Sequence, residues 1–222
     1  ALVDALHDAD PLMRHAGLNA LGQLPPKQRW LLADERLQDS VRSVRILAAV
    51  MLADVSSEEM PASQQVNFAE ASQEYLHSLQ FNADDPGAQV SLGDFHAARG
   101  EPVEAEQAYR EALLLDKNWV PAYINYADLL RRMHRDAEGE AVLREGLAHR
   151  PEAGALQHGL GLLLVRKKDF SNALVFLKQA AELEPDVIRY SYIYAVALHS
   201  AGQSALAQAV VKSALMKTPN DP

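Results

Sequence analysis

The sequence has 222 residues, with 21 Lys and Arg against 30 Asp and Glu, a formal net charge of −9 and no cysteine. The lack of cysteine excludes disulfides, thiolate catalysis and haem attachment through Cys-x-x-Cys-His within this chain. The acidic charge argues against a nucleic-acid partner, and no apolar run reaches the roughly 18 residues that a membrane insertion needs.

The segment 1–55 contains a pattern with a 31-residue period. Asp8 recurs as Asp39, and Arg14 recurs as Arg45. The Asp of a turn can form hydrogen bonds with the backbone or the Arg of the next repeat, and such Asp–Arg ladders hold the register of a solenoid. The pattern resembles the short form of the HEAT repeat; two ordinary amphipathic helices are the alternative. It predicts helices at 11–23, 27–37 and 41–54.

Residues 56–61 form the longest polar connector, and we expect a boundary there. The helix predicted at 62–80 carries Ala71, Tyr75 and Ser78 at the spacing of the second helix of a repeat pair. We therefore expect residues 62–85 to be a bridging helix and cap between two kinds of repeat. Asp85 and Pro86 then provide an N-cap carboxylate and a first-turn proline for the next helix.

From position 86 onward the chain consists of four equally long repeats, the segments 86–119, 120–153, 154–187 and 188–221. Positions 8, 20 and 27 of the four repeats hold only Ala or Gly: Gly93, Ala127, Gly161 and Ala195; Ala105, Gly139, Ala173 and Ala207; Ala112, Gly146, Ala180 and Ala214. Small residues at these positions would let two helices of one repeat, and the helix that follows, approach closely. Eight helices in pairs are predicted through residue 217.

This pattern resembles the tetratricopeptide repeat, which implies an all-α, right-handed α-solenoid of helix-turn-helix repeats. An unrelated Ala-rich bundle is the alternative. Pro151, Pro185 and Pro219 would end second helices. The resemblance departs from the family at position 4, where the usual Trp is replaced, so that position is degenerate. The residues there are Gln89, Tyr123, Gln157 and Ser191.

The sequence contains no motif for catalysis. Its eight histidines show no His-x-x-x-His or His-Glu-x-x-His spacing, and there is no calcium loop, Gly-rich phosphate loop or nucleophile elbow. We therefore expect no catalytic residue, no metal site, no cofactor and no enzyme activity.

The tetratricopeptide resemblance implies that the first helix of each repeat lines a concave groove that binds a protein or peptide. Asn125 would bond a peptide backbone, and Arg131, Arg166 and Arg189 would take a carboxylate. For each position, a solvated helix face or packing between neighbouring first helices is the alternative. The candidate residues are Asp94, Asn125, Asp128, Arg131, His158, Leu162, Arg166, Arg189, Tyr192 and His199.

One partner class can be tested against this resemblance. Co-chaperones of the family grip the C-terminal tail of a chaperone with Lys, Asn and Arg at five defined positions. Here those positions hold Val90, Asp94, Asn125, Ala155 and Gly159. Only Asn125 matches and Asp94 would repel the tail, so chaperone C-terminal tails are disfavoured as partners.

The order of HEAT-like repeats, bridging helix and tetratricopeptide repeats also resembles the C-terminal region of bacterial proteins that begin with a multihaem c-type cytochrome. That resemblance implies a periplasmic rather than a cytoplasmic location. We expect a fragment of a larger protein that acts as a non-catalytic protein–protein interaction scaffold. The alternatives are a ligand-sensing regulatory domain and a docking domain of a periplasmic multihaem electron-transfer protein.

Overall fold

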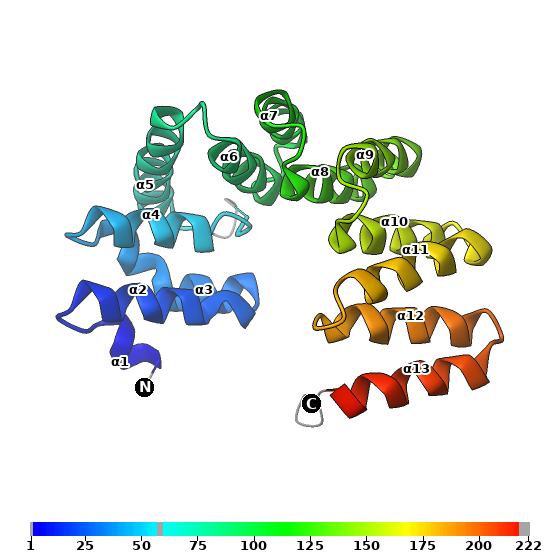
Figure 1. Ribbon diagram of the computed structural model, residues 1–222. Coiled ribbons are helices and arrows are strands. Elements are labelled where there is room, and N and C mark those ends of the chain that lie inside the picture. Colours follow the sequence, from blue (N-terminus) through cyan, green and yellow to red (C-terminus); the bar gives the residue numbers. More distant parts are fainter. Residues whose placement is uncertain (1, 57–59, 218–222) are drawn as a thin grey trace. The chain divides into compact units, whose positions relative to one another are not determined.

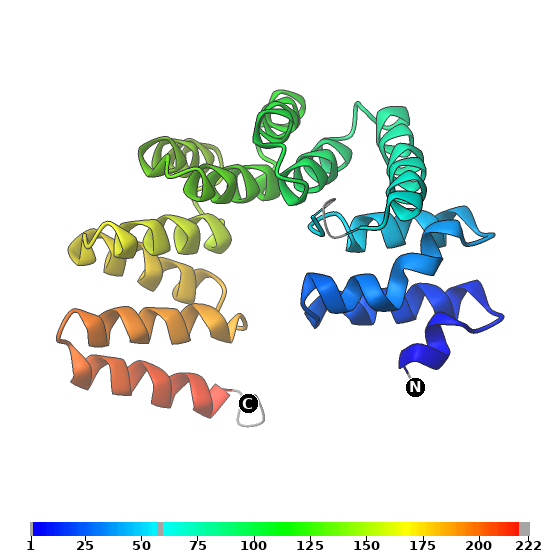
Figure 2. The ribbon, with the colours of Figure 1, turned by 180° about the vertical axis from the view of Figure 1, so that it is seen from behind.

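The computed structural model describes residues 2–56 and 60–217, and within these ranges all regular elements are helices. Figures 1 and 2 show them from two opposite sides. The all-α solenoid fold predicted from the repeats is confirmed. Pro219, the end of the 188–221 repeat and part of the predicted connector at 56–61 lie outside the described residues.

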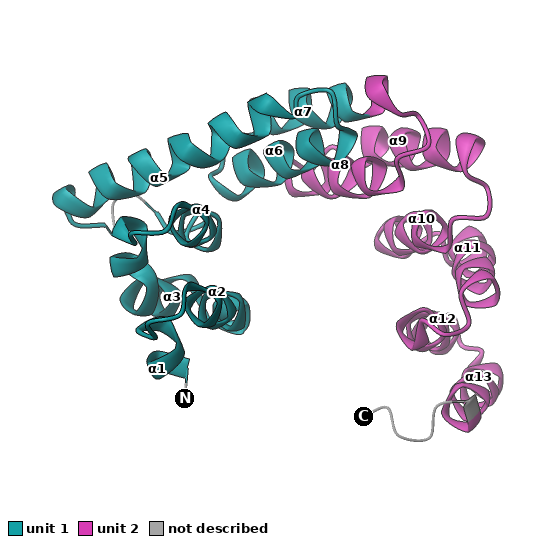
Figure 3. Cartoon of the chain, turned by 60° about the vertical axis from the view of Figure 1, so that its left-hand side comes forward, with its two compact units in different colours: residues 1–112 teal, residues 113–222 magenta. Residues whose placement is uncertain are grey.

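The N-terminal helices follow the 31-residue pattern, with short 3-10 turns after α2 and α3. They are α1 (Leu2–Leu6), α2 (Pro11–Ala20), η1 (Leu21–Gln23), α3 (Pro26–Ala33), η2 (Asp34–Gln38), α4 (Arg42–Met51) and α5 (Ala62–Phe81). The predicted helices at 11–23 and 27–37 thus each end in a tighter turn, and the helix predicted at 41–54 stops at Met51. The long α5 runs crosswise to α4, on which it packs (Figures 1 and 3).

The repeats from position 86 onward form four pairs of helices, as predicted. These are α6 (Pro86–Ala98) with α7 (Pro102–Leu115), α8 (Val120–Arg132) with α9 (Asp136–His149), α10 (Gly154–Arg166) with α11 (Phe170–Leu183), and α12 (Ile188–Ser200) with α13 (Ser204–Lys217).

Contacts divide the chain into two compact units, Ala1–Ala112 and Leu113–Pro222, coloured separately in Figure 3. The division falls within α7, whereas the sequence places a boundary at 56–61. The assignment of 1–55, 62–85 and 86–222 to three kinds of segment stays a prediction, because contact density and repeat register are different properties.

Small residues bring the helices of each repeat together. Of the twelve Ala and Gly at positions 8, 20 and 27, eleven are buried and Ala214 is partly buried. A methyl group added to Gly93 would lie 2.5 Å from Cε1 of Tyr109, and one added to Gly161 would lie 2.6 Å from Cγ of Leu177. Both distances are below van der Waals contact, so the large partner side chain occupies the space that a Cβ would need.

The turn between the helices of each repeat has the same backbone conformation. Gly100, His134, Lys168 and Gly202 occupy the same position in the four repeats and have φ of 72°, 59°, 61° and 79°. In each turn this left-handed residue and the next one donate back to the end of the first helix. The distances are 3.0 and 2.8 Å for His134 to Arg131 and Arg135 to Leu130. These paired bonds are the Schellman motif, which satisfies the last carbonyls of a helix.

The degenerate position 4 has a common structural role in three repeats. The side chains of Gln89, Tyr123 and Gln157 are all buried. They donate to the carbonyl oxygens of Ala83, Lys117 and Pro151 at 2.9, 3.0 and 2.8 Å, in each case six residues earlier. Each bond ties the loop before a first helix to that helix, although the residues differ.

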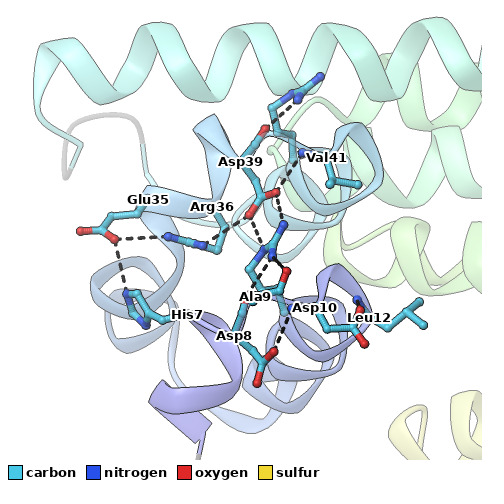
Figure 4. A network of polar contacts seen from close by, with 11 residues as sticks. His7, Asp8, Ala9, Asp10, Leu12, Glu35, Arg36, Asp39 and Val41 are labelled. Atoms are coloured by element: carbon cyan, nitrogen blue, oxygen red, sulfur yellow. Dashed lines mark hydrogen bonds and ion pairs between the residues drawn. The ribbon is translucent and has the colours of Figure 1, made fainter.

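An ionic ladder joins the N-terminal helices (Figure 4), but its Asp39 pairs with the Arg of the preceding repeat, whereas the pattern led us to expect a contact with the next repeat. Nε and Nη2 of Arg14 donate to the two carboxylate oxygens of Asp39 at 2.7 and 2.8 Å, while Nη1 donates to the carbonyl of Asp8 at 2.9 Å. Arg45 repeats the arrangement: its Nη1 donates to the carbonyl of Asp39 at 2.7 Å, and its Nη2 donates to Glu74 at 2.8 Å. Each Arg thus joins the turn before its own helix to a carboxylate that lies later in the chain, in the turn before α4 for Arg14 and on α5 for Arg45.

Asp39 stays ionised at the centre of this ladder. Burial raises the pKa of its carboxyl. Hydrogen bonds from Arg14 and from the Val41 amide, together with the nearby charges of Arg14 and Arg36, lower the pKa by more than burial raises it, so the pKa lies below its ordinary value. The Arg14 and Asp39 side chains are both almost fully buried. A bidentate pair in this setting is directional, and it aligns α2 with the turn before α4.

Two glycines of α9 provide a test of the packing. A methyl on Gly139 would meet its nearest neighbour, the Ala127 carbonyl oxygen, at 3.4 Å, but a methyl on Gly146 would lie 2.8 Å from Cγ of Tyr123. Gly139→Ala should therefore stabilise the chain by up to about 1 kcal/mol through helix propensity. Gly146→Ala should destabilise it by about 1–3 kcal/mol through overpacking. Urea denaturation of both variants checks this pair, and equal effects would contradict the packing described.

The ladder provides a second test. Asp39→Asn should lower the free energy of unfolding by about 3 kcal/mol, because it leaves the buried Arg14 guanidinium without its counter-charge. The control is Asp128→Asn, which removes an exposed carboxylate paired with Arg131 and should cost no more than about 1 kcal/mol. Comparable losses in urea denaturation would show that the ladder has no special role.

Candidate partner-binding surface

The first helices of the second unit carry most of the candidate residues. In that unit α8, α10 and α12 form one layer, and α9, α11 and α13 form the other (Figure 3). Each first helix packs on its own second helix. This arrangement buries the small positions between the layers and leaves the opposite side of the first helices for other contacts.

On α8, the candidate charges are paired with one another. Asp128 is exposed and lies 2.7 Å from Nη2 of Arg131 and 3.4 Å from Nε of Arg132. Asn125, one turn earlier, is partly buried. Asn125 thus lies one turn from a small group of opposite charges.

On α10, Leu162 is partly buried and Arg166 is exposed. Arg166 lies 3.3 Å from Asp136 at the start of α9. The next residue, Lys167, lies 2.6 Å from Glu140 of α9. Hydrogen bonds from Lys167 and then Arg144 lower the pKa of Glu140. These contacts tie the end of α10 to the preceding repeat.

The exposed ion pairs of α8 and α10 can be exchanged at low cost. An exposed pair contributes about 0–1 kcal/mol to stability, because solvent screens it and side-chain entropy opposes it. A partner carboxylate could therefore replace Asp128 or Asp136 beside an arginine without disturbing the fold.

On α12, three side chains lie along one groove. Tyr192 is 60% exposed, and it lines the groove together with Val196 and His199. Nδ1 of His199 lies 3.0 Å from Oγ of Ser204 at the start of α13. The groove has a volume of about 630 Å³, and its other wall is α13. Arg189, an exposed residue, precedes it on the same helix.

His158 does not have the exposed position predicted for it. It is only 5% exposed, and its ring stacks on Tyr190 of α12 with centroids 4.7 Å apart. Its Nε2 is buried, with no hydrogen-bond partner among the described residues. Burial, followed by the charge of Arg189, lowers the pKa of His158 to about 4. The alternative of packing between neighbouring first helices therefore describes His158, because the large Tyr190 ring covers it.

Asp94 lies on α6, in the other compact unit. It accepts a hydrogen bond from the hydroxyl of Tyr109 at 2.7 Å. Tyr109 is the side chain that fills the space beside Gly93. This hydrogen bond links Asp94 to the packing of its own repeat.

Sequence reasoning missed the α13 side of the groove. Val211, Lys212 and Leu215 line it. One signal was available: the segment from Val187 to Lys217 contains no Asp or Glu, in a chain that has 30 of them. The absence of acidic residues from this segment of an acidic chain indicates that its surface differs in charge from the other helices.

Residues 2–56 and 60–217 contain neither a candidate metal site nor a candidate membrane-spanning helix. No three His, Asp or Glu side chains gather where they could hold a metal ion. No helix in the same residues combines the length and apolar character needed to cross a membrane.

The burial of His158 predicts a pH dependence. Its folded-state pKa of about 4 lies below the unfolded value of about 6.5, so the unfolded chain binds the proton more tightly. The neutral ring of His158 contributes its full stabilisation when the pH is above the pKa of the unfolded state. This contribution is lost as the pH falls toward the pKa of the folded state. Relative to His158→Phe, the wild type should lose about 2 kcal/mol of unfolding free energy between pH 7 and pH 5. The exposed His149→Phe variant should follow the wild type; parallel curves for His158→Phe and wild type would disprove the effect.

Comparison with known proteins agrees with the helical-repeat fold. Residues 164–222 match the tetratricopeptide repeat family. Protein FlbA of Caulobacter vibrioides is 27% identical over 156 residues, which are 70% of this chain and 26% of FlbA, so the chain spans about a quarter of that relative's length.

Two solved structures have a similar fold. The crystal structure of MamA aligns with a TM-score of 0.55 and 18% identity, over 71% of this chain and 95% of MamA. That of YrrB, described as a TPR protein with an unusual peptide-binding site, aligns with a TM-score of 0.50 and 13% identity, over 88% and 95%. The HEAT-like and cytochrome resemblances stay predictions. The paired helices and the regular spacing of buried small residues give the chain an all-α helical-repeat fold, and residues 164–222 of it match the tetratricopeptide repeat family.

Proposed function

We propose that the chain is a non-catalytic scaffold that binds an extended segment of a partner protein along the first helices of its second unit. The observation that carries this proposal is the composition of that face. It combines a partly buried amide (Asn125), exposed arginines that already hold exchangeable carboxylates (Arg131 and Arg166), and an apolar side chain between them in sequence (Leu162).

Each element has a chemical use in peptide recognition. The amide of Asn125 supplies both a donor and an acceptor for a peptide backbone. The guanidinium groups can take an acidic side chain in a bidentate manner, and Leu162 can contact an apolar anchor. The peptide-binding site named for YrrB supports a peptide as the class of ligand.

A peptide selection tests the proposal. Peptides selected from a random library against the full chain should contain an acidic residue near an apolar one. They should bind the Asn125→Ala/Arg166→Ala double variant at least about tenfold more weakly, which corresponds to about 1.4 kcal/mol.

The matched control is Lys178→Ala, which removes an exposed cation from the other layer, on α11. It should leave the affinity of the same peptides unchanged. Equal affinity of the selected peptides for wild type and double variant would discard the assignment of this face.

A further inference from the structure

Two arginines occupy the same position on neighbouring first helices. Arg132 of α8 and Arg166 of α10 stand at position 13 of the 120–153 and 154–187 repeats, and both are exposed. The helices α8 and α10 contact one another and lie in one layer of the second unit (Figure 3). The two residues therefore form an arginine row that crosses the helices along the direction in which the repeats stack. A helix that packs on the end of the stack would lengthen this row and would not cover it.

Each arginine of the row has a carboxylate neighbour within the chain, but neither contact is tight. Nε of Arg132 lies 3.4 Å from Asp128, and Nη2 of Arg166 lies 3.3 Å from Asp136. A strong charge-assisted hydrogen bond measures about 2.7–2.9 Å. All four side chains are at least 40% exposed, so solvent screens both pairs. The row therefore selects for carboxylates, and the chain's own acids satisfy it only in part.

The spacing of the row restricts the conformation of an extended segment that binds there. Packed helices have axes about 8–10 Å apart, so equivalent residues on α8 and α10 are separated by about that distance. A β-strand advances about 3.3 Å per residue and repeats every two residues, which places side chains of one face about 6.6 or 13 Å apart. A polyproline II helix advances about 3.1 Å per residue and repeats every three residues, which gives about 9 Å. Of these two extended conformations, polyproline II matches the row.

We propose that the arginine row binds two acidic side chains, three residues apart, in a partner segment that adopts the polyproline II conformation. The proposal rests on the proposed function of this face, and it names the sequence pattern that the face recognises. Position 13 of the following repeat holds Ser200, whose exposed hydroxyl donates to the carbonyl oxygen of Val196 at 2.9 Å. Position 13 thus supplies a cation in two successive repeats but not in the third, so the pattern contains two acidic residues rather than a longer acidic run.

The probes are labelled peptides of about twelve residues, built from proline and alanine around two glutamates and one leucine, which is available to Leu162. The second glutamate follows the first by two, three or four residues, while the composition stays the same. Fluorescence anisotropy with the full chain should show the tightest binding at the spacing of three, at least about fivefold tighter than at the other two. Replacing the prolines of that peptide by glycine should weaken it, because the polyproline II conformation is then no longer preformed.

Exchange of charge identifies which arginine contacts which glutamate. Arg132→Glu and Arg166→Glu should each weaken the peptide with the spacing of three at least about tenfold. Changing one glutamate of the peptide to lysine should restore binding to one variant, and changing the other glutamate should restore binding to the other variant. The matched control is Arg150→Glu, which changes an exposed arginine at the end of α9 and should weaken binding less than about twofold. Circular dichroism should show the same helix content for all three variants, since each position is exposed.

Three results would overturn the proposal. They are no binding of any of the three peptides, equal or tighter binding at a spacing of two or four, and rescue of both arginine variants by the same lysine peptide. Failure of the proposed function is a separate result. It would appear as equal affinity of the library-selected peptides for the wild type and the Asn125→Ala/Arg166→Ala variant.

Discussion

The close approach of paired helices at glycine and alanine is the contact on which the helical repeats from residue 86 onward depend. Where a Cβ is missing, the ring of Tyr109 or the branched end of Leu177 enters the space. The result is close packing between two amphipathic helices that would be only marginally stable alone. The same contact recurs in every repeat, so the burial of one pair prepares a surface for the next helix. Within the second unit, this stacking leaves the candidate residues on the side of the first helices that faces away from the second helices (Figure 3).

Much of the fold could be predicted because it depends on residue size and spacing. Twelve Ala or Gly residues at three positions predicted which helix faces would meet, and the repeated Asp and Arg of the N-terminal segment predicted bonds between repeats, although Asp39 pairs with Arg14 of the preceding repeat and not with the next one. The conformation of the turns was less accessible. His134 and Lys168 adopt the left-handed backbone that Gly100 and Gly202 adopt at the equivalent positions, and neither residue type signals it. Their conformation follows from the Schellman bonds at the end of the first helix.

The candidate surface was harder to predict than the fold. Helical periodicity places His158 and Tyr192 at the same position of successive repeats, yet one is buried and the other is exposed. The difference comes from the next helix, and no pattern within a single repeat contains that information. The polar bonds of Gln89, Tyr123 and Gln157 were missed for a related reason. Their chemistry differs, and only the geometry shows that all three reach the same carbonyl position.

The ionic ladder gives the N-terminal helices a different kind of cohesion from that of α10–α13. Arg14 and Arg45 hold neighbouring elements through carboxylates and turn carbonyls, in addition to a buried apolar core that includes Leu18 and Leu52. The helices α10–α13 meet mainly through apolar surfaces. The guanidinium ion has the same planar donor arrangement as the arginine side chain and competes as a cation for the same oxygens. Urea is neutral and cannot replace the charge of an arginine. Urea therefore weakens apolar contacts in both parts of the chain. Guanidinium chloride does the same and, in the N-terminal helices, also displaces the arginines from their carboxylates.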